Sequence, residues 1–312
     1  MTPAIANLLL VALIGADAPA GGIRVFTELV EQGVKMSDGS MVKLPPPIMA
    51  DGLDAAEQRA ALEKVADARS PVDKLVAKGY YAPVVVKVRN VNRPQGEEPS
   101  VRAIDTWFVA HGDWDTLTSK DFLETVMKSK DEGKNQIVSK SGIFSDEEMA
   151  KRQLTATVKE GFEERFLYMT FSLFDRVEIS ATRFGVFQSG KESVLAAAYV
   201  DPRFDNDPEY PNQWRALVRN EQAEITLGPA HPFAHAGSYS KITRLKEPAE
   251  AVFIECHVVY EEPYGWFDGI NLVNQKVRPM INEKVRTFRR KLIAASEEKG
   301  ENKDKEAEKE KE

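Results

Sequence analysis

The alternation of apolar and polar residues is clearest near the end of the chain. Residues 251–262 alternate with the period of a strand. One face carries Val252, Ile254, Cys256, Val258 and Tyr260, and the other carries Phe253, Glu255, His257, Val259 and Glu261. Over residues 270–294, apolar residues recur every three or four positions, which predicts a long amphipathic helix. A final strand is thus followed closely by a final helix.

Two regions with different periods precede this block. Residues 21–79 contain short helical segments and a hairpin turn at Asp38-Gly39. From residue 80 the period becomes that of strands, over residues 83–91, 101–111, 165–175, 177–188, 193–200, 238–245 and 251–262. Short connections between these runs favour an antiparallel sheet over parallel βαβ units. The sequence therefore predicts an α+β fold, in which a helical N-terminal region (21–79) precedes a curved antiparallel sheet of about seven strands packed on the C-terminal helix (80–294).

The two ends of the chain differ from this middle part. Ile5–Ala16 is apolar and has the length of a signal-peptide core, and Ala18 and Ala20 fit the small-residue rule for cleavage after Ala20. The sequence therefore predicts a signal peptide over 1–20 and export to the periplasm or the medium; the alternative is a buried N-terminal helix. Residues 295–312 are mostly charged, with no apolar residue larger than alanine, which predicts a disordered tail.

The composition excludes several classes of protein. The net charge of −7 counts against a nucleic-acid partner, because such proteins usually carry a basic surplus. No apolar run reaches the ~18 residues of a membrane-spanning helix. Cys256 is the only cysteine, so the chain has no internal disulfide. Its place among valines and isoleucine predicts a packed core residue rather than a nucleophile.

The turn before the last helix carries a resemblance to a known family. It reads Glu262-Pro263-Tyr264-Gly265-Trp266-Phe267, and the preceding strand contains Ser238-Tyr239-Ser240-Lys241-Ile242-Thr243. This C-terminal part is similar to the end of lipid-transfer START domains, which have an acid-Pro-x-Gly-aromatic turn before their last helix. The resemblance implies a helix-grip fold, in which sheet and helix enclose a cavity for an apolar ligand. It also implies binding or transfer, although some relatives of the fold are enzymes.

Aromatic and apolar side chains are the candidates to line such a cavity. They are Trp107, Trp266, Phe267, Met280 and Phe288. The alternative is that these side chains simply fill the core. A closed apolar cavity of at least ~300 Å³ between helix and sheet would favour a ligand, and a filled interior would oppose it.

A metal site is the second possibility. His231 and His235 are four residues apart, so on a helix they would share one face and could share a metal ion. Pro232 biases His231 away from helix, so an ordinary loop is the alternative. A metal-dependent hydrolase would require convergence among Asp105, His111, Asp113, His231, His235 and His257. The acidic loop at 201–212 is a candidate calcium site or a plain turn.

No cofactor motif accompanies these candidates. The chain has no P-loop, no Gly-x-Gly-x-x-Gly and no Gly-x-Ser-x-Gly elbow, so no cofactor is predicted and catalysis is left open.

The polar face of the last helix is basic. It carries Lys276, Arg278, Lys284, Arg286, Arg289, Arg290 and Lys291 against Glu283. Such a face is either solvated or docks on an anionic membrane or an acidic partner. Three functions follow as hypotheses. The first is non-enzymatic binding of a hydrophobic small molecule or lipid, the second is a metal-dependent hydrolase, and the third is an envelope interaction or scaffold protein without a small-molecule ligand.

Overall fold

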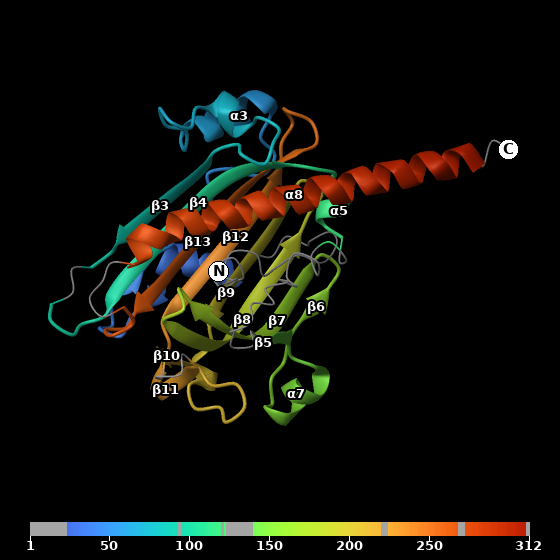
Figure 1. Ribbon diagram of the computed structural model, residues 1–312. Coiled ribbons are helices and arrows are strands. Elements are labelled where there is room, and N and C mark those ends of the chain that lie inside the picture. The colour runs from blue at the N-terminus through green and yellow to red at the C-terminus, as the bar shows by residue number, and fades with distance from the viewer. Residues whose placement is uncertain are drawn as a thin grey trace.

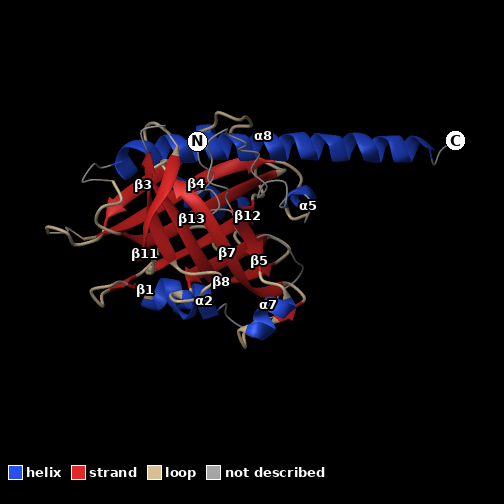
Figure 2. Ribbon diagram, turned by 60° about the horizontal axis from the view of Figure 1, so that its bottom comes forward, coloured by secondary structure: helices blue, strands red, loops and turns tan. Residues whose placement is uncertain are grey.

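The computed structural model describes residues 24–92, 95–119, 122, 140–219, 224–267 and 272–309, and the side chains of residues 140 and 300–309 are not described. The predicted signal segment (1–20) lies outside the described residues. An 11-stranded antiparallel sheet forms the body of the protein, with a long helix on one face and the N-terminal segments on the other (Figures 1 and 2).

The strands of the large sheet are β3 (Val84–Asn90), β4 (Ser100–His111), β5 (Lys140–Ile143), β6 (Val158–Lys159), β7 (Phe162–Leu173), β8 (Val177–Ser189), β9 (Ser193–Val200), β10 (Gln213–Arg219), β11 (Ile225–Pro232), β12 (Ala236–Arg244) and β13 (Ala251–Glu262). They run in the order β11-β10-β8-β9-β12-β13-β4-β3, and β7 pairs with β5, β6 and β8. The predicted α+β class and antiparallel sheet are confirmed.

The sheet has more strands than the seven predicted. Strands β10 and β11 lie in a stretch that was predicted to hold no strand. The reason is physical: most side chains of β11 are exposed, and the strand contains Gly228, Pro229 and Pro232. An edge strand of this kind has no buried face, so it shows no apolar alternation.

The sheet forks at β8. Strand β7 pairs along one whole edge of β8, whereas β10 and β9 share the other edge, at Val177–Ser180 and Arg183–Ser189 respectively. Asn212 fills the fork between them: its side chain accepts a hydrogen bond from the Thr182 N–H (2.8 Å) and donates one to the Asp201 carbonyl (2.8 Å). Because of this fork, β9 and β10 both form backbone hydrogen bonds with β8, and no unpaired strand edge lies between them.

Helix α8 (Leu272–Lys309) lies across β3 and β4 (Figure 1). The face of the sheet beneath it is called the α8 face below. The buried residues of α8 recur at the predicted spacing: Leu272, Val273, Val277, Ile281, Val285, Phe288 and Leu292. The helix continues to Lys309, past residue 294 and through most of the segment predicted to be a disordered tail. Alanine, glutamate and lysine have high helix propensity, which favours helix here despite the lack of large apolar residues.

The N-terminal segments cover the other face of the sheet, which is called the N-terminal face below (Figure 2). They are α2 (Arg24–Thr27), the π-helical turn η1 (Glu28–Gln32), the hairpin β1 (Val34–Lys35) and β2 (Met41–Val42), α3 (Ala55–Glu63) and α4 (Val72–Leu75). The predicted hairpin turn is present, with Gly39 at a φ of 83°. Because both faces are covered, β4 and β13 are buried along nearly their whole length.

Three short elements complete the described chain: α5 (Trp114–Leu117), α7 (Asp146–Lys151) and the 3-10 turn η2 (Pro202–Phe204). A capping box starts α7: Glu148 N–H donates to Ser145 Oγ (3.2 Å), and Ser145 N–H donates to Glu148 Oε2 (2.8 Å).

Candidate functional site

An apolar cavity lies on the α8 face of the sheet, beside the turn that precedes α8. Its walls include Ile104, Phe171, Leu173, Ile179, Phe233 and Val258. Tyr260 and Trp266 also line it, and Arg183 is its one charged wall residue among those described. None of the described residues of α8 lines the cavity, so it is enclosed by strands and by the turn rather than by the helix.

The cavity is smaller than the resemblance implies. Its volume is about 30 Å³, which is enough for a water molecule but far below the ~300 Å³ expected of a ligand pocket. Aromatic side chains occupy the space: the Trp266 ring stacks on those of Phe233 (5.8 Å between centroids) and Tyr260 (6.3 Å). The expected large cavity is therefore absent from the described structure, and any bound molecule has to displace these rings.

Arg183 has an unusual environment for a buried cation. It follows Ile179 and Ala181 on the α8 face of β8 and is 4% exposed. Its Nη2 donates to Ser238 Oγ (2.6 Å), whereas Nη1 has no hydrogen-bond partner. Burial lowers the pKa of the guanidinium to about 10, and no carboxylate of the described residues offsets that effect.

Two further polar groups of the cavity wall lack partners. The Tyr260 hydroxyl and the Trp266 Nε1–H are both buried without a hydrogen bond among the described residues. Burial raises the pKa of Tyr260, so its hydroxyl keeps its proton. With Arg183 Nη1, three residues of the wall therefore carry an unpartnered donor, although the surface that they present to the cavity is apolar.

The residues predicted to line the cavity separate into different places. Trp266 lines it, whereas Phe267 packs on Phe174 and Trp266, and Phe288 packs on Phe108 and Phe122. Met280 is partly buried against the same core. Phe267, Phe288 and Met280 therefore fit the alternative interpretation, in which these side chains fill the core.

Trp107 lies on the opposite face of the sheet. Its ring meets His257 at 5.3 Å between centroids, and Lys87 Nζ lies 5.2 Å from the ring centroid. The prediction that it lines the cavity is wrong because odd-numbered residues of β4 face the N-terminal segments, whereas Ile104 and Phe108 face α8.

Arg183 was missed by sequence reasoning. A usable signal exists: Val177, Ile179, Ala181 and Phe187 form one apolar row of β8, and Arg183 interrupts that row. A single charged residue within an otherwise buried row is informative, because such residues are rarely fully buried without a partner.

The predicted metal ligands have separate environments. His231 ends strand β11 and stacks on Trp214 (4.7 Å between centroids), so the premise that it shares a helical face with His235 is wrong. His235 has a φ of 60°, and its Nδ1 lies 2.7 Å from the Lys35 carbonyl oxygen. Across the described residues, no group of three or more His, Cys, Asp or Glu side chains is arranged to hold a metal ion.

The wider set required for a hydrolase does not converge either. His111 Nε2 lies 3.0 Å from the Val76 carbonyl, and Asp113 caps α5 and pairs with Lys299 (2.7 Å). The hydrogen-bonded pair in this set is Asp105 with His257, which lies on the N-terminal face. The hydrolase hypothesis required these groups to meet at one site, and they do not.

A buried charged cluster surrounds that pair. His257 is fully buried, with Nδ1 2.8 Å from Asp105 Oδ1 and Nε2 3.8 Å from Glu255 Oε2. Burial lowers the pKa of His257, but its hydrogen bond to Asp105 and its charge attraction to the two carboxylates outweigh burial and raise that pKa. Burial raises the pKa of Asp105, and its contacts with His257 and Arg89 outweigh burial and lower it. Both shifts favour an ion pair.

The same cluster holds the segment 45–51 on the sheet. Glu255 accepts from the backbone N–H groups of Ile48 (2.8 Å) and Met49 (3.3 Å), and Lys241 Nζ donates to the Met49 carbonyl (2.7 Å). His257 Nε2 has no hydrogen-bond partner among the described residues, so no hydroxyl nucleophile adjoins it. This arrangement holds the segment 45–51 on the sheet and lacks the hydroxyl nucleophile of a catalytic triad.

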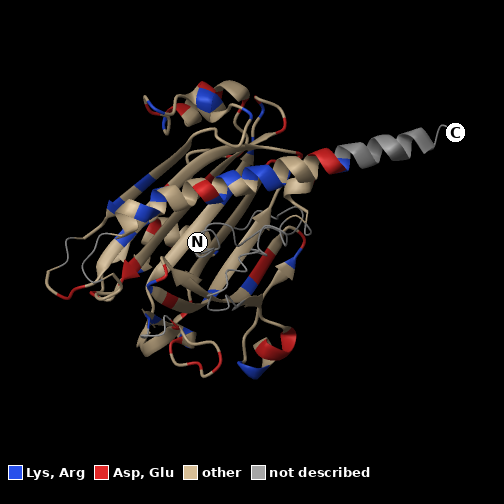
Figure 3. Ribbon diagram, in the orientation of Figure 1, with Lys and Arg blue, Asp and Glu red and all other residues tan. Residues whose placement is uncertain are grey.

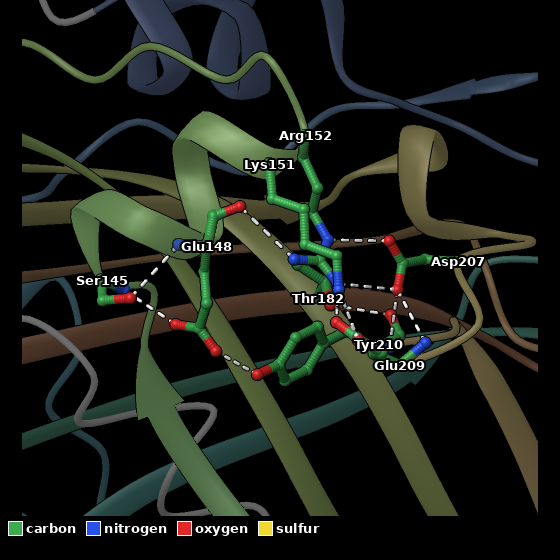
Figure 4. Close-up of polar contacts among 8 residues, drawn as sticks. All are labelled: Ser145, Glu148, Lys151, Arg152, Thr182, Asp207, Glu209 and Tyr210. Atoms are coloured by element: carbon green, nitrogen blue, oxygen red, sulfur yellow. Dashed lines mark hydrogen bonds and ion pairs between the residues drawn. The ribbon is translucent and has the colours of Figure 1, made fainter.

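Protein cations pair with Asp201, Asp207 and Glu209 of the acidic loop at 201–212. Arg152 donates to Asp207 Oδ2 (2.8 Å) and Glu209 Oε2 (2.6 Å) and lies over the Tyr210 ring (Figure 4). The Tyr210 hydroxyl donates to Glu148, which connects the loop to α7. Asp201 is likewise paired with Arg203. With its carboxylates engaged in this way, the loop is an ion-pair clamp between α7 and β10 rather than a calcium site.

The basic face of α8 is only partly available. Basic positions recur along α8 (Figure 3). Lys276, Arg278 and Arg290 are exposed, but Arg289, which was predicted to belong to this face, is buried. The side chain of Arg286 stacks on Tyr81 at 4.5 Å. Docking of this face on an anionic membrane stays a prediction. Within the described residues, no helix combines the length and apolar character needed to cross a membrane.

Comparisons with known proteins give a limited result. No protein-family model matches the chain, and no curated protein sequence matches it. Among solved structures, the chain is similar to a crystal structure of human STARD10, a START domain, with 12% sequence identity and a TM-score of 0.35. The similarity covers 79% of this chain and 84% of that chain. This weak START-like resemblance concerns the fold alone, and it agrees with the one predicted from the C-terminal residues.

Proposed function

We propose that the protein binds a hydrophobic small molecule or lipid chain on the α8 face of its sheet. The observation that carries the proposal is the apolar cavity itself. Protein interiors are close-packed, with few voids that can hold a water molecule, so a void with an apolar wall is a candidate place for an apolar ligand. An apolar chain that enters there would be sheltered from water by Phe171, Leu173 and Ile179.

The turn before α8 is the proposed entrance. Trp266 lies on this turn rather than within a strand or helix, and its ring forms part of the cavity wall. Turn residues open at a lower free energy than core strands. Outward rotation of Trp266 would enlarge the cavity while the hydrogen bonds of the strands stay intact.

Binding rather than catalysis is proposed because of the residues that form the wall. No carboxylate, histidine or thiol belongs to the described cavity lining, so it lacks a general base or a nucleophile of the usual kinds. The surface of the wall is apolar, which suits an apolar ligand.

A cavity-filling substitution tests the proposal. Ala181→Val adds two methyl groups to the cavity wall, where Ala181 is 2% exposed, and is expected to weaken binding of dodecanol and dodecanoate by about tenfold. Binding is measured by isothermal titration calorimetry below the aggregation concentration of each compound. Ala196→Val is the matched control, because Ala196, in β9, lies on the same face of the sheet as Ala181 but outside the cavity.

The control defines what would contradict the proposal. Both substitutions overpack a core and are expected to cost about 1–3 kcal/mol of stability, so only the difference in binding separates them. If the unaltered protein binds neither compound, or if both variants bind as it does, the cavity is not a ligand site.

We also propose that the chain is exported, with Ile5–Ala16 as the core of the signal peptide. The described structure begins at Arg24, so cleavage after Ala20 would remove none of it. The expected result is a mature protein that begins at Gly21, established by intact-mass measurement after expression in a Gram-negative bacterium. A protein found in the cytoplasmic fraction with residues 1–20 attached would contradict export.

A further inference from the structure

Positive charge is concentrated on helix α8, where Lys and Arg positions follow one another along the ribbon (Figure 3). Residues 272–296 carry seven Lys or Arg and one Glu, which is a balance of +6 in a chain whose net charge is −7. The rest of the chain therefore carries −13. Such a separation of charge creates a positive potential over one surface, so an anionic partner is attracted to that surface rather than to the protein as a whole.

The cations of this helix are largely not neutralised by the protein itself. Within the described part of the chain, Lys276, Arg278 and Arg290 are exposed and form no ion pair. Glu283 is the one acidic residue of the stretch, and it is paired with Arg286 at 2.8 Å. The exposed positive charges are therefore available to an external anion.

Two exposed tyrosines lie beside these cations, in the segment that precedes β3. Tyr81 is 76% exposed and Tyr80 is 38% exposed. Arg286 lies over the Tyr81 ring, 4.5 Å from its centroid, and Arg290 lies over the Tyr80 ring, 5.9 Å from its centroid. Arg289 holds this segment beside α8, because its guanidinium donates to the Tyr80 carbonyl oxygen (3.4 Å). Cations and tyrosine rings thus share one surface of the protein.

This combination matches the chemistry of an anionic membrane surface. Lysine and arginine are attracted to anionic headgroups, and tyrosine rings favour the headgroup level of a bilayer. The apolar stripe of α8 is packed on the sheet, as at Val277 and Val285, so the helix would dock on the headgroups without inserting that stripe into lipid. The cations alone would suit any polyanion, and the exposed tyrosine rings favour a bilayer.

We propose that this surface docks the protein on a bilayer rich in anionic lipid. The inference goes beyond the proposed function, because it concerns a surface outside the cavity and needs no bound ligand. The residues that form this docking surface are Lys276, Arg278, Arg286, Arg290, Tyr80 and Tyr81.

Vesicle sedimentation with the full chain tests the proposal. The unaltered protein is expected to bind vesicles of equal parts phosphatidylcholine and phosphatidylglycerol at least about tenfold more tightly than vesicles of phosphatidylcholine alone. That preference is expected to disappear at an ionic strength of about 1 M, because the screening length shortens from ~10 Å at about 0.1 M to ~3 Å. Residues 1–20 are present in every variant, so differences between variants report on the docking surface.

Removal of the three unpaired cations is the central variant. The triple substitution Lys276→Gln, Arg278→Gln and Arg290→Gln is expected to weaken binding to the anionic vesicles about hundredfold. Each cation near an anionic leaflet contributes about fivefold in affinity, and the three contributions multiply. All three side chains are exposed, so the fold is expected to persist, which circular dichroism checks.

A matched control removes the same charge from other surfaces. Lys43→Gln, Lys159→Gln and Lys191→Gln are combined, because these three lysines are exposed and lie outside β3 and β4, the strands that α8 crosses. This variant is expected to change the affinity by less than about twofold, since charges farther than a screening length from the lipid contribute little.

A second pair of variants tests the tyrosine contribution. Tyr81→Ala is expected to weaken binding several-fold, because the ring no longer enters the headgroup layer. Met41→Ala is the control, because Met41 is 50% exposed but lies in the hairpin on the N-terminal face. It should leave binding unchanged.

The outcomes that would overturn the proposal concern the lipid, the position of the charge and the class of partner. Equal binding of the two kinds of vesicle would show that anionic lipid is not recognised. Equal losses in the two triple variants would show that overall charge, rather than the docking surface, attracts the lipid. Binding of polyglutamate without binding of the anionic vesicles would assign the surface to an acidic polypeptide. Each of these outcomes would leave the proposed function standing, because the cavity is tested with soluble amphiphiles.

Discussion

Replacing Arg289 with methionine is expected to lower the free energy of unfolding by about 3–5 kcal/mol. Arg289 lies on the buried side of α8, and its guanidinium donates to the carbonyl oxygens of Val109 (2.8 Å), Pro83 (3.1 Å), Tyr80 (3.4 Å) and Ala82. Methionine fills much of the same space but donates no hydrogen bond. Several carbonyl oxygens between α4 and β3 would then lose their donor in a buried place, and each such loss is costly.

Urea unfolding monitored by circular dichroism measures this effect. Arg290→Met is the matched control, because Arg290 is the next residue but is exposed, at 5.9 Å from the Tyr80 ring. Its loss is expected to cost less than about 1 kcal/mol. Arg289→Lys should recover part of the stability, since an ammonium group can reach some but not all of the same oxygens. Equal losses for Arg289→Met and Arg290→Met would refute the role given to Arg289.

Arg289 also shows why part of the helix was misread from the sequence. The run Arg286, Arg289, Arg290, Lys291 was interpreted as one solvated face because all four residues are basic. Periodicity gives a different answer: Arg289 follows Val285 by four positions and precedes Leu292 by three, which places it in the apolar stripe. The basic character of Arg289 suggests a solvated position, whereas its spacing predicts a buried one. A long basic side chain can occupy a buried position when it donates to buried carbonyl oxygens.

Local patterns predicted the features that depend on neighbours along the chain. The two faces of β13 are as predicted: Cys256 is buried on the α8 face, where burial raises its pKa to about 12, and His257 is buried on the other. The partners of these residues come from distant strands and could not be read from local periodicity. Asp105 meets His257 across β4 and β13, and Ser238 meets Arg183 from β12.

The cavity shows the same limit on a larger scale. A resemblance in one turn could not state the volume of the cavity, because volume depends on how every surrounding ring packs. Arg183 became a candidate only when its burial and its missing partner were visible together. A charged residue in a buried row is a sequence signal that does not need homologous sequences.

Replacing His257 with glutamine is expected to destabilise the protein by about 3–5 kcal/mol near pH 6, and by less as the pH rises. The imidazolium lies between two buried carboxylates, and without it Glu255 loses a positive charge 3.8 Å away while it keeps its hydrogen bonds from the Ile48 and Met49 N–H groups. Because the pKa of His257 is raised above 6.5 in the folded state, its stabilisation is complete below pH 6.5 and is lost as the pH rises through the folded pKa.

His111 provides a control of opposite sign. Burial lowers the pKa of His111, so the unfolded state binds a proton more readily and the folded state loses stability as the pH falls below 6.5. Urea unfolding from pH 5 to pH 9 should therefore show a stability difference between the unaltered protein and His257→Gln that shrinks with rising pH. The corresponding difference for His111→Gln should grow with rising pH. A difference for His257→Gln that does not change with pH would mean that the histidine is neutral in the folded protein, and the segment 45–51 would then be held without an ion pair at His257.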